Sequence, residues 1–183
     1  MKITAVIFIL ASHTYASDSV EISGVKFPAS YTHENRNLTL RGYAVLNYMY
    51  IIKAYAGAFY LEEGKSRAEA LGRSARVLEL EYFRNIKGED FAEATEVMIK
   101  KNVTPAQYQA MKDRVDRFNS LYRDVKPGDR YRALYIPGRG TSLYHNNRLI
   151  STTEGDDFAF AFFSVWLGRN PIDADFRSNL LGK

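Results

Sequence analysis

The sequence predicts one α+β domain, and three observations lead to this prediction. Residues 38–61 form a long segment, poor in charge and rich in Tyr, Val, Ile and Phe, which is the composition of a buried sheet. Residues 88–101 and 104–122 carry apolar residues at helical spacing. Residues 130–153 alternate in short runs separated by tight turns, which is typical of an antiparallel meander. We find no internal repeat and no linker.

Residues 38–61 are apolar on both alternating sides, which predicts a central strand covered on both faces. Because the segment is too long for one ordinary strand, we expect a bend or hairpin turn near residues 46–48. Four small residues leave room for another part of the chain to approach the sheet closely: Ala54, Ala56, Gly57 and Ala58.

Lys53 is the charged residue of an otherwise apolar run, and Tyr55 follows two positions later. At strand spacing the two side chains share one face. A lysine there can orient a carboxylate or phenolate, with the tyrosine hydroxyl as a second donor, so this pair is our candidate ligand site. Alternatively, Lys53 lies near a strand end and extends its ammonium group into water.

The first sixteen residues resemble a secretory signal peptide. Lys2 precedes an apolar run over residues 3–11, and small and polar residues lead to Ala16, after which we expect cleavage. The run is too short to span a membrane. A buried first strand is the alternative. The mature domain is then residues 17–183, and its lack of cysteine favours a bacterial periplasm over a disulfide-forming secretory route.

Charge and composition limit the classes of partner that the sequence predicts. Cleavage would remove one positive charge, that of Lys2, and lower the formal net charge from +4 to +3. The basic residues are mixed with acidic ones, so the sequence predicts no nucleic-acid binding. It predicts no membrane span in the mature chain, and it indicates no particular protein partner.

The other strands are shorter. Residues 17–27 read as a strand pair that turns at Ser23-Gly24, and the polar residues 28–37 read as a loop. Residues 75–83 alternate, with Val77, Glu79 and Glu81 on one side, which predicts a strand with one face in water. The opposite side carries Leu78, Leu80 and Tyr82.

Capping residues define the helices. Ser66 precedes a short helix that Gly72 ends, and Thr104, Pro105 and Gln107 form a capping box before a helix with one apolar stripe. Asp156 or Asp157 caps a helix to residue 167 that is apolar nearly all round, so it is buried or forms the wall of a pocket. Gly168 ends it, and Asp173 caps a last short helix.

The sequence matches no common catalytic or metal-binding motif. His33 and His145 stand far apart without neighbouring carboxylates at helical spacing, so we predict no metal site. The Gly138-Arg139-Gly140 turn leads into a strand and lacks the Lys-Ser or Lys-Thr of a phosphate loop. A G-x-S-x-G nucleophile motif is absent from the sequence. We predict no cofactor.

Several short motifs occur together in a characteristic order. They are GVKFP (24–28), LRG (40–42), KAYAGAFYL (53–61), VKPGD (125–129), PGRGT (137–141) and FSVWLG (163–168), followed by Pro171 and Leu180-Leu181. In this order the mature chain resembles the chalcone isomerase-like family, specifically its small exported bacterial branch. The resemblance implies an open-faced β-sandwich: a large antiparallel sheet, a layer of helices on one face and a smaller sheet opposite.

The resemblance also implies what the cleft between sheet and helices does. Plant enzymes of this fold bind a flavonoid there, using an arginine with a threonine, a tyrosine and an asparagine, whereas other members bind fatty acids or act as non-catalytic helpers. By spacing, the arginine corresponds to Asn47, with Arg41 the nearest alternative, and the threonine corresponds to Tyr55. The tyrosine and asparagine fall near Phe91 and Met98, which cannot donate those hydrogen bonds.

The resemblance therefore implies the fold and not chalcone cyclisation, and we assign no catalytic residue. Our first hypothesis is a periplasmic, non-enzymatic protein that binds a small apolar or amphipathic ligand, such as a fatty acid. The ligand would lie between the sheet and the helices at residues 91–98 and 158–166. Its polar end would be oriented by Lys53 and Tyr55, or by Asn47 and Arg41. The alternatives are an isomerase or intramolecular lyase with altered site residues, and a structural accessory protein.

Overall fold

A computed structural model describes residues 18–48 and 52–183, so the predicted signal segment lies outside the described residues. The main element is a seven-stranded antiparallel sheet whose strands follow one another in chain order. Its members are β3 (Ser30–His33), β4 (Arg36–Tyr48), β5 (Ile52–Glu62), β6 (Arg76–Tyr82), β7 (Arg130–Ile136), β8 (Gly140–His145) and β9 (Arg148–Thr153). Strands β1 (Ser19–Ile22) and β2 (Val25–Pro28) pair separately as a hairpin.

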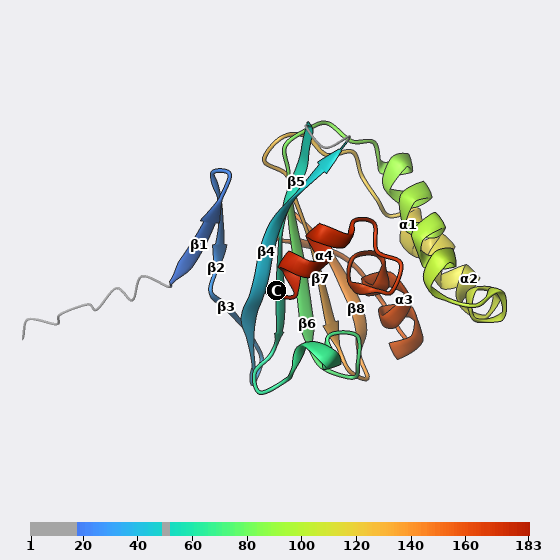
Figure 1. Cartoon of the computed structure of the whole chain (residues 1–183). Helices are drawn as coiled ribbons and strands as arrows, with labels where there is room; N and C mark the ends of the chain where they lie inside the picture. The colour runs from blue at the N-terminus through green and yellow to red at the C-terminus, as the bar shows by residue number, and fades with distance from the viewer. Residues whose placement is uncertain (1–17, 49–51) are drawn as a thin grey trace, which may run out of the picture.

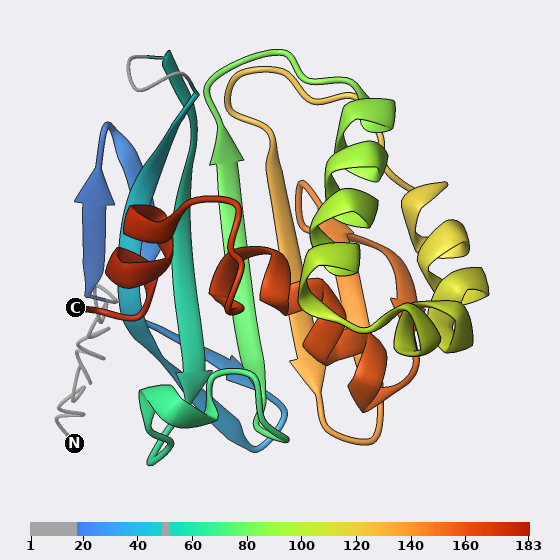
Figure 2. The ribbon, with the colours of Figure 1, turned by 45° about the vertical axis from the view of Figure 1, so that its right-hand side comes forward.

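Helices cover one face of the large sheet, and the β1–β2 hairpin covers part of the other face (Figures 1 and 2). The helices are α1 (Gly88–Asn102), α2 (Pro105–Asn119), α3 (Asp156–Leu167) and α4 (Ala174–Leu180), with a 3₁₀ turn at Arg67–Glu69. This arrangement confirms the predicted α+β class and the open-faced β-sandwich of the resembled family.

Strands β4 and β5 are the two halves of the long apolar segment, and they pair antiparallel as far as Tyr48 opposite Ile52, so the chain reverses direction just after the predicted position. Along β5, Phe59 and Leu61 enter the helix-side core, whereas Ala58 and Tyr60 enter a second core beneath the β1–β2 hairpin. The strand is therefore buried on both faces, as its sequence predicts.

Small residues let α4 approach the sheet closely. A Cβ atom on Gly57 would lie 2.6 Å from the Cζ atom of Phe176. A Cβ atom on Gly42 would lie 2.0 Å from the carbonyl oxygen of Asn179. Helix α4, which packs against β4 and β5, thus confirms the predicted close approach at Gly57, whereas Ala56 and Ala58 belong to the core beneath the hairpin.

Two predictions about the strands are wrong. Residues 28–37 are not a loop, because β3 and the start of β4 form a hairpin there, and β3 keeps polar side chains as an edge strand. The outer face of β6 is not in water. Glu79 is 3% exposed, because the β1–β2 hairpin and β3 cover this face and its carboxylate accepts hydrogen bonds from Tyr31 and Arg130.

Most predicted caps and turns are confirmed. Thr104 Oγ1 accepts from the Gln107 amide at 3.3 Å, and the Gln107 side chain accepts from the Thr104 amide at 2.8 Å. Asp173 caps α4 by accepting from the Phe176 amide. The N-cap of α3 is Gly155, not Asp156 or Asp157 as predicted. The two aspartates lie in the first turn instead, where their negative charges interact favourably with the positive end of the helix dipole.

Candidate functional site

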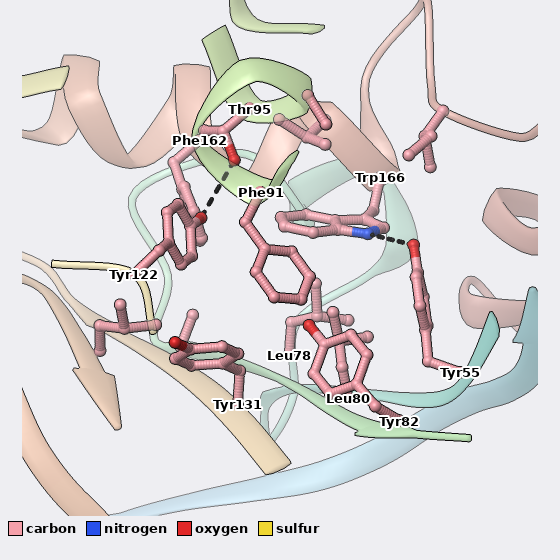
Figure 3. A pocket seen from close by; sticks show the side chains of 15 residues that line it. Tyr55, Leu78, Leu80, Tyr82, Phe91, Thr95, Tyr122, Tyr131, Phe162 and Trp166 are labelled. Atoms are coloured by element: carbon pink, nitrogen blue, oxygen red, sulfur yellow. Dashed lines mark hydrogen bonds between the residues drawn. The ribbon is translucent and has the colours of Figure 1, made fainter. Parts of the chain in front are cut away.

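A cavity of about 70 Å³ lies between the sheet and the helices α1 and α3 (Figure 3). Strands β5 to β8 supply its floor, and the helices with the loop before α4 supply its walls. Its lining is almost wholly apolar and rich in aromatic rings: Tyr55, Leu78, Leu80, Tyr82, Phe91, Ala94, Thr95, Tyr122, Tyr131, Ala133, Leu143, Phe162, Val165, Trp166 and Ile172.

Three of the four tyrosine hydroxyls at the cavity have hydrogen-bond partners within the protein. Trp166 Nε1 donates to the Tyr55 hydroxyl at 3.0 Å. The Tyr122 hydroxyl lies 3.0 Å from Thr95 Oγ1, and the Tyr131 hydroxyl donates to the carbonyl of Arg123 at 3.1 Å. Dashed lines mark the first two bonds in Figure 3. These bonds hold the rings at both ends of the cavity in fixed orientations.

The Tyr82 hydroxyl is different. It points towards the middle of the cavity between the rings of Phe91 and Tyr131, and it has no hydrogen-bond partner among the described residues (Figure 3). Tyr82 is 2% exposed as a residue, but its hydroxyl oxygen is not fully buried and is accessible from the cavity. A hydroxyl in this position is expected to bind a water molecule or a ligand.

The lining is electrically neutral. Burial raises the pKa of Tyr82 well above its usual range, and the neighbouring tyrosines raise it further. Burial likewise raises the pKa of Tyr55, although its hydrogen bond from Trp166 opposes the shift. No charged residue occurs among the described residues that line the cavity. The phenols therefore remain protonated donors throughout the physiological pH range.

A surface groove of about 330 Å³ lies beside the cavity on the outer side of α1. It is lined by Asp90, Glu93, Ala94, Val97, Met98 and Ile172. Ala94 and Ile172 line both the groove and the cavity, and Ile172 is 39% exposed. These two apolar side chains therefore lie between the cavity and the groove.

Comparison with protein families gives a match to the family model described as chalcone isomerase-like over residues 19–182. The chain belongs to the chalcone isomerase-like family. Among solved structures, it is similar to a fatty-acid binding protein of Arabidopsis thaliana, with a TM-score of 0.66 and 16% identity, over 90% of this chain and 96% of that one. At this identity the likeness shows the fold alone. A comparison with curated proteins gives no match.

Of the four predicted ligand-binding residues, the structure brings Tyr55 to the cavity. Lys53 lies on the opposite face of the sheet, where its Nζ donates to Ser23 Oγ in the β1–β2 turn at 3.0 Å. The cause is an irregularity in the β4–β5 register: Leu46 pairs with Tyr55 and Asn47 with Lys53, so Ala54 is an extra residue. Lys53 and Tyr55 therefore do not share a face as predicted, and Lys53 is exposed, as the alternative interpretation expects.

Asn47 and Arg41 also lie away from the cavity lining. Asn47 is exposed beside the β4–β5 turn, opposite Lys53. Arg41 is the extra residue of a second irregularity between Leu40 and Gly42, and its Nη2 atom donates to the carbonyl of Lys65 at 2.9 Å. The position that corresponds to the plant enzymes' arginine thus offers no cation to this cavity.

The predicted walls are largely confirmed, since Phe91 and the α3 residues Phe162 and Trp166 line the cavity, whereas Met98 lines the groove instead. Sequence reasoning missed the role of Tyr82, Tyr122 and Tyr131. One available signal was the alternation of β6, which already placed Tyr82 on the apolar side with Leu78 and Leu80.

Within residues 18–48 and 52–183, no group of three or more His, Cys, Asp or Glu side chains is arranged to hold a metal ion. None of the helices in this part of the chain is both long and apolar enough to cross a membrane.

Proposed function

We propose that this chalcone isomerase-like protein is a periplasmic, non-catalytic binding protein for a small apolar or amphipathic ligand. The observation that carries the proposal is the neutral, aromatic cavity between sheet and helices, which shares Ala94 and Ile172 with a surface groove. Sites of this kind, apolar with a few convergent polar groups, are the usual form of small-molecule sites. The periplasmic location rests on the signal-like sequence at residues 1–16.

The dimensions favour a ligand with a narrow apolar chain. The cavity of about 70 Å³ is smaller than the roughly 300 Å³ of an ordinary ligand site and about half the ~150 Å³ of an apolar cavity that takes up benzene. It therefore accepts one small part of a ligand, and the remainder would follow the groove of about 330 Å³ along α1. An alkyl chain meets this requirement, and fatty acids are one such class; the similar Arabidopsis protein is itself described as a fatty-acid binding protein.

The chemistry of the lining supports binding over catalysis. General acid–base catalysis needs a group whose pKa lies near the working pH. The described lining offers tyrosine hydroxyls with raised pKa values and an indole, but no histidine, carboxyl or amino group. An isomerase or intramolecular lyase, the first alternative, would require such groups or a cation at the cavity. A structural accessory role, the second alternative, predicts that no small molecule binds.

The first test is native mass spectrometry of the mature protein isolated from its own cells, followed by organic extraction. The proposal predicts a co-purifying apolar or amphipathic compound. Its failure would be a protein without bound mass that also shows no response to added fatty acids, alcohols or aromatic compounds. That result would favour the accessory role.

The second test locates the site. Trp166 is the chain's single tryptophan and lines the cavity, so its fluorescence reports directly on occupancy. Ala94→Phe places a ring at the mouth of the cavity and is expected to weaken binding strongly. Ala110→Phe, at a different surface hollow on α2, is the matched control and should leave binding unchanged. Equal effects of both substitutions would contradict the proposed site.

Among the residues named from the sequence, we propose a ligand contact for Tyr55 alone, because it lines the cavity. Lys53→Ala, Asn47→Ala and Arg41→Ala are expected to leave affinity unchanged. Measurement of the dissociation constant for each variant by Trp166 fluorescence checks this assignment, and a large loss in Lys53→Ala would contradict it.

A further inference from the structure

Charged side chains occur in the groove but not in the described lining of the cavity. The described residues that line the cavity include no cation, and the charged residues that line the adjoining groove are both acids, Asp90 and Glu93. Burial of a carboxylate in an apolar site without a paired cation is very costly. An anionic head group would meet acidic side chains at the groove and no compensating charge inside.

The cavity nevertheless contains one polar group that can form a hydrogen bond with a ligand. The Tyr82 hydroxyl points into the cavity without a hydrogen bond to the described residues, whereas Tyr55, Tyr122 and Tyr131 are already paired (Figure 3). A protonated phenol donates one hydrogen bond and accepts others. The complementary ligand group is therefore an oxygen that accepts from Tyr82 and carries no charge.

We propose that the ligand enters the cavity with an uncharged oxygen-bearing group, such as an alcohol, ketone or ester, which accepts a hydrogen bond from Tyr82. Its apolar chain leaves past Ala94 and Ile172 and lies along the groove on α1. This inference rests on the proposed binding function and narrows its ligand class from amphipathic molecules in general to neutral ones.

A head-group series with one common tail tests the charge preference. Octanol, octanoate and octyltrimethylammonium share the alkyl chain and differ in the charge of the head. We expect octanol to bind most tightly to the wild-type protein in Trp166 fluorescence titrations at neutral pH, by at least about tenfold over octanoate, given the cost of an unpaired buried charge.

The outcomes separate the two proposals. Tightest binding of octanoate, or of the ammonium compound through the aromatic faces, would overturn the neutral-ligand inference and leave the binding function standing. No binding of any of the three, together with a protein isolated without a bound compound, would overturn the binding function itself.

Two matched tyrosine substitutions test the contact. Tyr82→Phe removes the unpaired hydroxyl and is expected to weaken octanol binding by roughly threefold to tenfold, the usual value of one hydrogen bond. Tyr108→Phe removes a hydroxyl that donates to Glu96 and lies outside the cavity lining, so it should change the affinity by less than about twofold. Affinity unchanged in Tyr82→Phe, or lowered equally in both folded variants, would overturn the assignment of Tyr82.

Discussion

The hairpin face of the seven-stranded sheet and the cavity on its helix face treat polar groups in opposite ways. On the hairpin face, Glu79 is buried but accepts hydrogen bonds from Tyr31 and from Arg130 Nη1, the latter at 3.1 Å. Arg130 also donates to Glu81 at 2.5 Å and to the backbone of Lys26 at 2.9 Å. On the helix face, the described lining of the cavity carries no charged residue, and the Tyr82 hydroxyl has no hydrogen-bond partner among the described residues.

The difference separates a structural surface from the proposed binding surface. Charges on the hairpin face are paired with each other and with β2, which ties the small hairpin to the large sheet. Pairing leaves these groups nothing to offer a ligand. On the helix face, aromatic rings pack around the cavity and the Tyr82 hydroxyl, and their contacts stabilise this part of the fold.

The largest expected effect comes from the buried network. Glu79→Ala leaves Arg130 without its most buried partner and removes the acceptor of Tyr31, so the free energy of unfolding should fall by about 3 kcal/mol. Urea unfolding monitored by circular dichroism measures it. Glu34→Ala, which breaks an exposed ion pair with Arg139, is the control and should cost less than about 1 kcal/mol. Similar losses for both would contradict the structural role of the network.

A matched pair of Tyr→Phe substitutions compares the two faces directly. Tyr31→Phe removes a donor to the buried Glu79 and should cost about 1–2 kcal/mol. Tyr82→Phe removes a hydroxyl that has no partner among the described residues, so stability of the ligand-free protein should stay within about 0.5 kcal/mol or rise. If Tyr82→Phe were the more destabilising substitution, its hydroxyl would have a structural partner and the comparison would fail.

The smallest expected effect concerns pH. Burial lowers the pKa of His145, whose ring lies 5.0 Å from that of the cavity residue Tyr131, and nearby Asp129 opposes this shift. As pH falls through about 6.5, the unfolded chain takes up a proton before the folded protein does, so the free energy of unfolding decreases.

We expect this decrease to begin as the pH falls below about 7, and we expect His145→Gln to reduce it. Urea unfolding at several pH values measures both proteins. An equal or steeper decline in the variant would show that other groups cause the pH dependence.

Local sequence signals predicted much of the fold. Alternation located most strands, the capping residues around Thr104 and Asp173 located helix starts, and a run of apolar residues identified α3 as a pocket wall. These features depend on residues close together in the chain, which is why they can be read from one sequence.

The site itself was less predictable, because it depends on register and on contacts between distant segments. One extra residue at Ala54 turns Lys53 to the opposite face from Tyr55, and simple alternation cannot reveal such an irregularity. Glu79 appeared to face water because its partners come from β3 and β7, far away in the sequence. That the Tyr82 hydroxyl is unpaired is likewise visible only once every neighbour is in place.

The most direct test of the account is to observe which face of the sheet responds to a ligand. Methyl and amide chemical shifts of the isotope-labelled mature protein, recorded with and without octanol, provide this measurement. The account predicts changes at Ala94, Ala133 and Ile172, around the cavity, and none at Val25, Ala58 and Ile136, beneath the hairpin. Changes concentrated beneath the hairpin or at Lys53, with the cavity residues unaffected, would contradict it.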